Sequence, residues 1–86
     1  MKYKILFTKQ AEKDLKKVAV SNLKNKVFHL LSVLEDNPMQ PPWEKLIDLD
    51  STYSRRINLQ HRLVYQIIEE EKVVKIIRLW SHYGDN

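Results

Sequence analysis

Three prolines, Pro38, Pro41 and Pro42, divide the chain into two halves that differ in the period of their apolar residues. Proline fixes φ and has no backbone N–H, so the stretch NPMQPPWEKL (37–46) must be an extended loop rather than a helix or a central strand. Before this loop, apolar residues recur every three to four positions, as in amphipathic helices. After it, alternation and β-branched residues indicate strands. The change of period predicts an α+β domain.

The first half predicts one strand followed by a helical hairpin. The stretch KYKILFT (2–8) has the composition of a short strand, and Thr8 is suited to cap the helix that follows. Lysines on the other side of this helix are most simply a solvated surface. The second helix is predicted to begin at a cap on Ser21 and to stop before Pro38. One apolar stripe on the first helix comprises Ala11, Leu15, Val18 and Ala19.

The second half predicts three or four strands, beginning at Leu46. Breaks are expected near DLDST (48–52), LQ (59–60) and EEEK (69–72). Runs such as LVYQII and VVKIIRLW are too apolar for a sheet exposed to water on both faces, so the helices should cover one side. The predicted order is β-α-α-β-β-β, with a helical hairpin packed on a small, mainly antiparallel sheet, in a single domain over residues 1–86.

The composition narrows the class of protein. The chain has 86 residues and no cysteine, which excludes disulfides and cysteine-bearing zinc sites and is compatible with a cytoplasmic protein. No apolar run approaches the roughly 18 residues of a membrane span. The net charge of +4 suggests a polyanionic partner, although charge alone does not decide this.

The chain offers little for a metal or cofactor site. No two histidines have metal-ligand spacing, and one glycine, Gly84, cannot make a phosphate-binding glycine loop, so we expect neither metal nor cofactor. His29 is expected at the edge of the core, and His61 at the exposed start of a strand.

Three arginines occur in the stretch SRRINLQHRLVYQI (54–67), which otherwise predicts a plain hairpin. If a tight turn lies at Leu59 and Gln60, Arg56 and Arg62 face each other across the two strands. Like charges in this position destabilise a sheet, so an anion is expected between them. The alternative, equally open on the pattern alone, is that each pairs with a carboxylate such as Asp48, Asp50 or Glu69.

Glu44 and His82 add two groups that can transfer protons. Taken singly, Glu44 is a loop carboxylate in water and His82 a surface histidine near the end of the last strand. A carboxylate, arginines and a histidine together are the parts needed for metal-free RNA cleavage. In that reaction a base removes the 2′-hydroxyl proton, cations hold the phosphoryl charge, and an acid protonates the leaving 5′-oxygen.

Four motifs in order, PPWEKL, YSRRI, QHRLVYQ and WSHY, resemble the landmarks of the YoeB/Txe toxins, which have the RelE-like fold. They cover residues 41–83 densely, whereas the helical half is similar only in pattern. The resemblance implies a toxin of a toxin-antitoxin system that cleaves mRNA in the ribosomal A site as an endoribonuclease. Two departures are the glycine-free IDLDST before SRRI and the three residues Gly84, Asp85 and Asn86 after the His-Tyr pair.

The resemblance also implies roles for individual residues, and under it the hairpin cations are expected to meet a phosphate. Glu44 resembles the general base and His82 the general acid. Arg62 resembles the arginine that steadies the scissile phosphate, Arg56 a supporting phosphate contact, and Tyr83 a tyrosine that positions the substrate.

The implied partners are a Phd/YefM-type antitoxin, the ribosome and mRNA, with operator DNA bound only through the antitoxin complex. A homodimer is left open. Two alternatives to the nuclease are a ParE-like poison of DNA gyrase on the same fold and a non-enzymatic module that docks an antitoxin or operator DNA.

Overall fold

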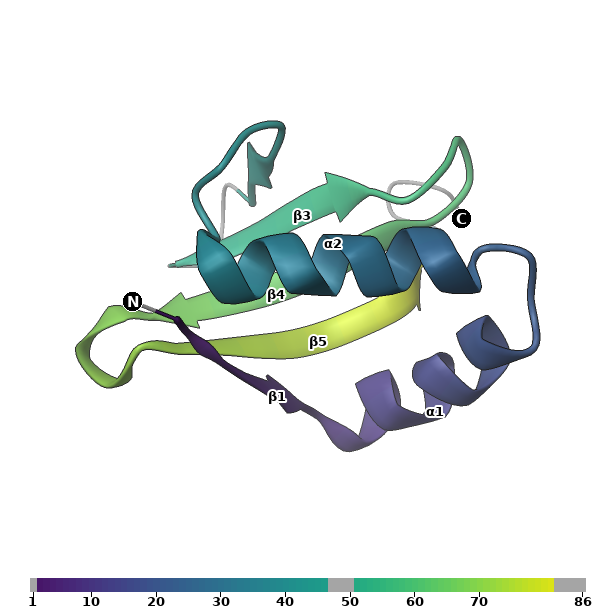
Figure 1. The fold of residues 1–86 in the computed structure, drawn as a ribbon, viewed down its shortest axis with the longest axis horizontal. Helices are drawn as coiled ribbons and strands as arrows, with labels where there is room; N and C mark the ends of the chain where they lie inside the picture. Colours follow the sequence, from purple (N-terminus) through teal and green to yellow (C-terminus); the bar gives the residue numbers. More distant parts are fainter. Residues whose placement is uncertain (1, 47–50, 82–86) are drawn as a thin grey trace.

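A five-stranded sheet and two helices make up the fold, and the computed structural model describes residues 2–46 and 51–81 (Figure 1). The sheet order is β1-β5-β4-β3-β2, with β1 parallel to β5 and the other pairs antiparallel. A 3-10 turn, η1 (Glu69–Glu71), joins β4 to β5. The elements in chain order are β1 (Lys4–Phe7), α1 (Lys9–Ala19), α2 (Lys24–Asp36), β2 (Glu44–Lys45), β3 (Thr52–Arg56), β4 (Arg62–Ile68) and β5 (Val73–Ser81).

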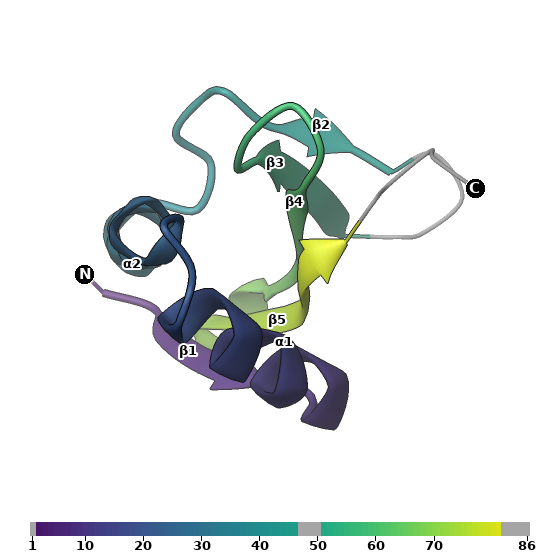
Figure 2. The ribbon, with the colours of Figure 1, turned by 90° about the vertical axis from the view of Figure 1, so that its right-hand side faces the viewer.

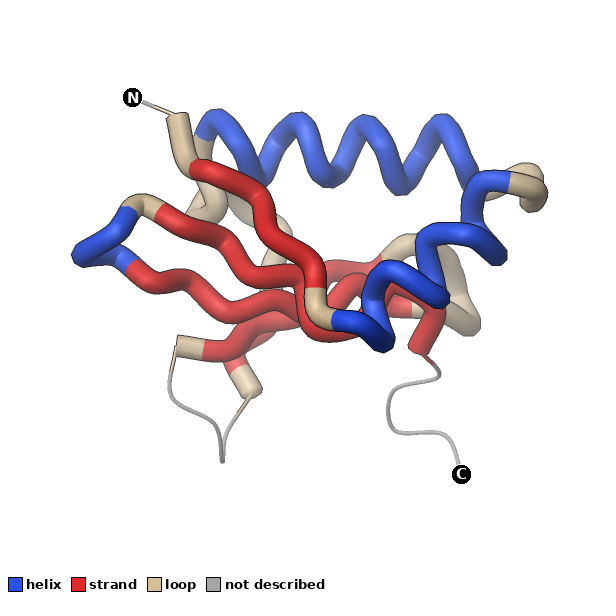
Figure 3. The backbone as a smooth tube through the Cα atoms, turned by 90° about the horizontal axis from the view of Figure 1, so that it is seen from below, coloured by secondary structure: helices blue, strands red, loops and turns tan. Residues whose placement is uncertain are grey.

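Both helices contribute to one core on one face of the sheet, as predicted (Figures 2 and 3). Alternation along β4 turns every second side chain towards the helices, and these side chains are buried. The core comprises Ala11, Val18, Val27, Leu34, Ile57, Leu63, Tyr65, Ile67, Val74, Ile76 and Leu79. The predicted α+β architecture is therefore confirmed.

Helix α1 begins as predicted and buries part of the predicted stripe, since Ala11 and Val18 are fully buried. The Thr8 hydroxyl accepts a hydrogen bond from the Ala11 N–H at 3.0 Å, which confirms the cap. Ala19, the last residue of the helix, is exposed, against the prediction. Asp14 is fully buried instead, and the lysines of the opposite side are exposed as expected.

Helix α2 begins later than predicted, at Lys24 with Leu23 as its cap residue. Ser21 is not the cap: its hydroxyl donates to the Val18 carbonyl at 2.9 Å and accepts from the Leu23 N–H at 3.1 Å. Ser21 therefore closes the turn between the helices.

The two histidine expectations were wrong. His29 is exposed on α2, whereas His61 is buried at 6% exposure. The turn between β3 and β4 folds His61 inwards, because the Ile57 N–H donates to the His61 carbonyl at 2.9 Å.

The loop after α2 ends in an extra strand. Glu44 and Lys45 form β2, which pairs with Ser54 and Tyr53 of β3, so the stranded half begins before Leu46. The predicted breaks at 59–60 and 69–72 are confirmed, since β3 and β4 are separated by the turn at 57–61 and β4 and β5 by η1. Most of the break at 48–52 lies outside the described residues.

Candidate active site

The β3–β4 hairpin places Arg56 and Arg62 directly opposite each other. The turn that sets this register is held by the Asn58 side chain, whose Oδ1 accepts from the N–H groups of Gln60 at 2.9 Å and His61 at 2.7 Å. The predicted convergence of two cations is therefore confirmed.

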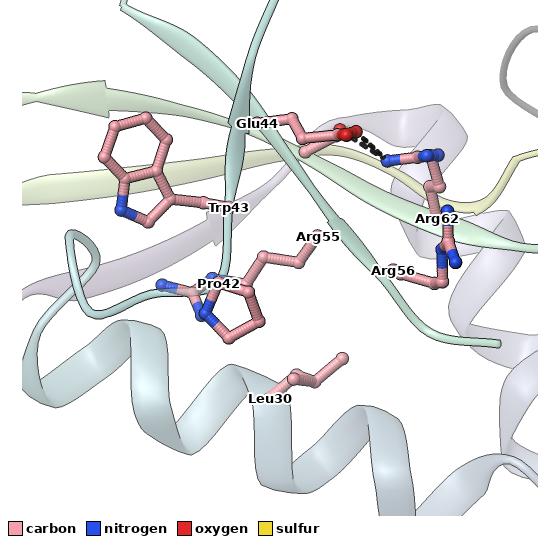
Figure 4. Close-up of a pocket in the computed structure, with 8 residues that line it drawn as sticks. Leu30, Pro42, Trp43, Glu44, Arg55, Arg56 and Arg62 are labelled. Atoms are coloured by element: carbon pink, nitrogen blue, oxygen red, sulfur yellow. Dashed lines mark hydrogen bonds and ion pairs between the residues drawn. The ribbon is translucent and has the colours of Figure 1, made fainter.

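Glu44 supplies the carboxylate that meets this pair. Arg62 Nη1 donates to Glu44 Oε1 and, at 3.3 Å, to the hydroxyl of Ser54 (Figure 4). The Arg62 side chain is 19% exposed and that of Glu44 is 65% exposed, so an exposed carboxylate pairs with an arginine whose side chain is mostly buried. An exposed partner makes such an ion pair easy to exchange for another anion.

Of the carboxylates considered from the sequence, Glu69 is not the partner of Arg62. Glu69 instead pairs with Lys72 at 2.6 Å, in an exposed contact on η1. Asp48 and Asp50 lie outside the described residues. Arg62 pairs with Glu44, which is itself a candidate site residue.

A pocket of about 310 Å³ surrounds these groups, at the lower end of the roughly 300–1,000 Å³ usual for ligand sites. Arg56 is exposed at its wall and, within residues 2–46 and 51–81, forms no ion pair. Among the described residues, the pocket thus combines a cation without an ion pair, an exchangeable ion pair and an apolar side. Its lining is Leu30, Pro42, Trp43, Glu44, Ser54, Arg55, Arg56 and Arg62.

Arg55, the third arginine of the hairpin, has a structural role that the sequence analysis missed. It is 3% exposed, and its Nη2 donates to the carbonyls of Pro38, at 3.1 Å, and Gln40. Its Nε donates to the Tyr65 hydroxyl at 3.2 Å. The expectation that the hairpin cations meet a phosphate does not apply to Arg55, which ties the proline loop to the sheet.

Aromatic contacts fix the residue that precedes Glu44. Trp43 Nε1 donates to the Met39 carbonyl at 2.8 Å, and its ring meets Tyr53 edge-on, with centroids 5.2 Å apart. Tyr53 stacks in turn on Tyr65 at 5.9 Å. Burial raises the pKa of Tyr65, although Arg55 lowers it in part, so its hydroxyl stays protonated and donates to the Pro38 carbonyl at 3.3 Å.

Two predicted site residues, His82 and Tyr83, lie outside the described residues. Strand β5 ends at Ser81, which pairs with Arg62, so His82 is the next residue in sequence after the partner of Arg62. Within the described part of the chain, no group of three acidic, histidine or cysteine side chains could hold a metal ion. No described helix is long and apolar enough to span a membrane.

Comparison with known proteins identifies the family. Residues 5–85 match the sequence model of the "ParE toxin of type II toxin-antitoxin system, parDE". No curated protein sequence matches the chain at a significant level.

Three solved structures illustrate the similarity. The YoeB dimer from Staphylococcus aureus is 32% identical, with a TM-score of 0.81, covering 96% of this chain and 100% of that one. YoeB in the YoeB-YefM complex from the same organism is 34% identical, with a TM-score of 0.77 and the same coverage. A mutant of the E. coli toxin RelE in the free state is 26% identical, with a TM-score of 0.79, covering 99% of this chain and 88% of that one. The family model matches nearly the whole chain, and YoeB relatives with the same fold are more than 30% identical to it. The chain therefore belongs to the ParE toxin family of type II toxin-antitoxin systems, as a YoeB/RelE-like toxin.

Proposed function

We propose that this toxin is a ribosome-dependent endoribonuclease that cleaves mRNA in the A site. The observation that carries the proposal is the contact between Glu44 and Arg62, with Arg56 directly opposite Arg62, in one pocket. A base beside a phosphate-binding pair of cations is what transfer of a phosphoryl group to the 2′-oxygen requires. A gyrase poison or a purely docking module needs no such arrangement.

In the free protein, the Glu44 carboxylate forms an ion pair with Arg62. We infer that an incoming phosphate takes the place of the carboxylate on Arg62, and that Arg56 binds a second phosphoryl oxygen. This exchange is feasible because an ion pair with a solvent-exposed partner is worth only about 0.2–1 kcal/mol. It also releases Glu44 beside the substrate, where its carboxylate can accept a proton.

Cleavage then follows in one displacement. Glu44 removes the proton of the 2′-hydroxyl, the 2′-oxygen bonds to phosphorus, and the bond from phosphorus to the 5′-oxygen breaks. Arg62 and Arg56 stabilise the negative charge that builds on the phosphoryl oxygens. His82 gives a proton to the leaving 5′-oxygen, and Tyr83 positions the substrate. The products are a 2′,3′-cyclic phosphate and a 5′-hydroxyl, and no step needs a metal ligand from the protein.

The proposed inhibitor is a Phd/YefM-type antitoxin, in keeping with the relative that was solved as a YoeB-YefM complex. An acidic segment of the antitoxin can pair with Arg56 and Arg62 where phosphates would bind. Operator DNA is then bound through the antitoxin complex. A homodimer is proposed by analogy with the YoeB dimer, and the site of action is the cytoplasmic ribosome.

The test uses purified toxin and ribosomes stalled with a defined codon in the A site, at fixed magnesium and with transition metals chelated. Primer extension should show one cut in that codon, and mass spectrometry a cyclic phosphate end. The matched variants are Arg62→Ala, which should lose cleavage, and Lys13→Ala, on the exposed side of α1, which should keep it.

A parallel arm measures cleavage complexes of DNA gyrase with the same protein. Intact mRNA together with trapped gyrase complexes would overturn the nuclease assignment and favour the ParE-like activity. Intact mRNA without any effect on gyrase would also overturn the nuclease assignment and would favour the non-enzymatic docking module.

A further inference from the structure

Among residues 2–46 and 51–81, no strand lies beside the end of β5 on the side of β1. Strand β1 pairs with β5 only as far as Phe7 opposite Ile76, and the chain then turns into α1, while β5 runs on to Ser81 (Figure 1). Backbone groups of residues 77–81 on that side must therefore find partners other than a strand.

The same segment is irregular against β4 on its other side. Val64 pairs with Arg78, but the neighbouring Tyr65 pairs with Ile76, which leaves Ile77 as an extra residue on β5. A second extra residue lies between Arg78 and Ser81. Two bulges within one strand bend it strongly, and bulges are common beside active sites, where they redirect the chain.

Helix α1 and its cap residue Thr8 supply hydrogen-bond partners at both irregular places. The Thr8 hydroxyl donates to the Ile77 carbonyl at 3.0 Å. The Asp14 carboxylate accepts from the Leu79 N–H at 3.0 Å and from Arg78 Nε at 2.9 Å. Thr8 and Asp14 thus replace a strand along the bulged part of β5.

Asp14 is a fully buried ionised group in a surface helix, which calls for a specific reason. Burial raises the pKa of Asp14, but the hydrogen bonds from Arg78, Leu79 and Gln10 outweigh this effect and bring the pKa below its usual value. The carboxylate is therefore ionised at neutral pH, and its charge strengthens the bond to the strand.

From these contacts we infer that Asp14 is a positioning residue for the active site. It holds the double-bulged end of β5 in the register that places Ser81 opposite Arg62. Asp14 thereby fixes the position of Ser81, the residue that directly precedes His82 in the sequence. Asp14 does not touch the substrate pocket, whose lining contains no residue of α1.

The catalytic part of this inference rests on the proposed function, so the first readout does not involve activity. NMR measures the cross-strand NOE between Arg62 and Ser81 and, in the same spectra, the NOE between Ile67 and Val74 in the regular part of the ladder. In Asp14→Ala the first should disappear and the second remain. Both should remain in Val27→Ala, a variant that weakens the core from α2 without touching β5 through a hydrogen bond. Persistence of the Arg62–Ser81 NOE in Asp14→Ala would overturn the inference.

Asp14→Asn keeps an acceptor oxygen but loses the charge, and it provides the test if the alanine variant does not fold. Its Leu79 amide should exchange with deuterium about tenfold faster than in the wild type, as expected for replacing a charged acceptor by a neutral one, while the Val74 amide is unchanged. Equal acceleration of both amides, or of neither, would contradict a local role.

The second readout is cleavage. A site displaced by about 1 Å typically loses on the order of 10²-fold in rate, so Asp14→Ala should lose about this much, and Val27→Ala little under conditions where both are folded. A substrate with sulfur in place of the scissile 5′-oxygen needs no proton from the acid and should restore Asp14→Ala, as it should restore His82→Ala. If the sulfur substrate did not restore cleavage by Asp14→Ala, the loss of rate would not arise from misplacement of the general acid, and the positioning role would be refuted. If the wild type itself does not cleave RNA, the proposed nuclease fails, while the NMR result still decides the role of Asp14.

Discussion

Replacing Glu44 by glutamine should strengthen RNA binding and at the same time suppress cleavage. In the free protein the Glu44 carboxylate competes with phosphate for Arg62. Glutamine has nearly the same shape but no charge, so it releases the guanidinium and cannot accept the 2′-hydroxyl proton as a carboxylate does. The two effects therefore have opposite signs, which a simple loss of structure would not produce.

The size of the binding effect follows from the exposure of the pair. With the carboxylate 65% exposed, the ion pair falls in the class worth about 0.2–1 kcal/mol. Removing this competition should lower the dissociation constant by about 1.4- to 5-fold, and nearer the upper value because the Arg62 side chain is mostly buried. Loss of the general base should reduce the cleavage rate by about 10²- to 10⁴-fold.

Binding is measured by fluorescence anisotropy with an RNA whose 2′-hydroxyl at the cleavage site is replaced by hydrogen, so that no reaction occurs. Glu70→Gln is the matched control, because it makes the same change of net charge on η1, away from the pocket. The gain of Glu44→Gln over this control should persist at moderate salt, whereas a general charge effect is screened. Equal affinities of the two variants would refute the competition between Glu44 and phosphate.

Four further variants should behave as follows. Below about pH 4, the free energy of unfolding of the wild type, measured in urea, should fall more steeply than that of Asp14→Asn. The pKa of Asp14 is lower in the folded state than in the unfolded state, so protonation of Asp14 destabilises the wild type as the pH falls through the folded-state value. Arg55→Met should cost about 2–5 kcal/mol in the same assay, since it leaves buried carbonyls of the proline loop without donors; a cost below about 1 kcal/mol would contradict its anchoring role. Arg62→Ala should slow cleavage by about 10²- to 10³-fold and Arg56→Ala by less, because Arg56 is the more exposed of the two; the reverse order in single-turnover assays would exchange their roles.

Local periodicity accounts for the parts of the fold that the sequence predicted well. The helical half was recognised from the apolar stripe and the cap at Thr8, and the facing arginines from strand alternation and a tight turn. These features depend on residues within a few positions of one another. A pattern read along the chain therefore contains nearly all the information that determines them.

The misses depend on partners far away in sequence. Asp14 was not expected in the core, because the groups that make its burial tolerable, Arg78 and the Leu79 N–H, lie at the other end of the chain. Arg55 could not be separated from Arg56 by residue type. The carbonyls that Arg55 binds belong to an irregular loop, whose path the pattern of residues does not predict. The pairing of Glu44 with Arg62 likewise required the short strand β2, which proline-rich surroundings conceal.

The strand order also bears on how a cell can make this toxin. Strand β5 is the last strand in sequence, yet it lies inside the sheet between β1 and β4. During synthesis, β1 therefore leaves the ribosome long before its partner, and until then the sheet consists of β2, β3 and β4 alone. Such a small antiparallel ribbon is only marginally stable, and contacts between distant segments form late. The complete sheet, and with it the register that places Ser81 opposite Arg62, can therefore form only after β5 has been synthesised.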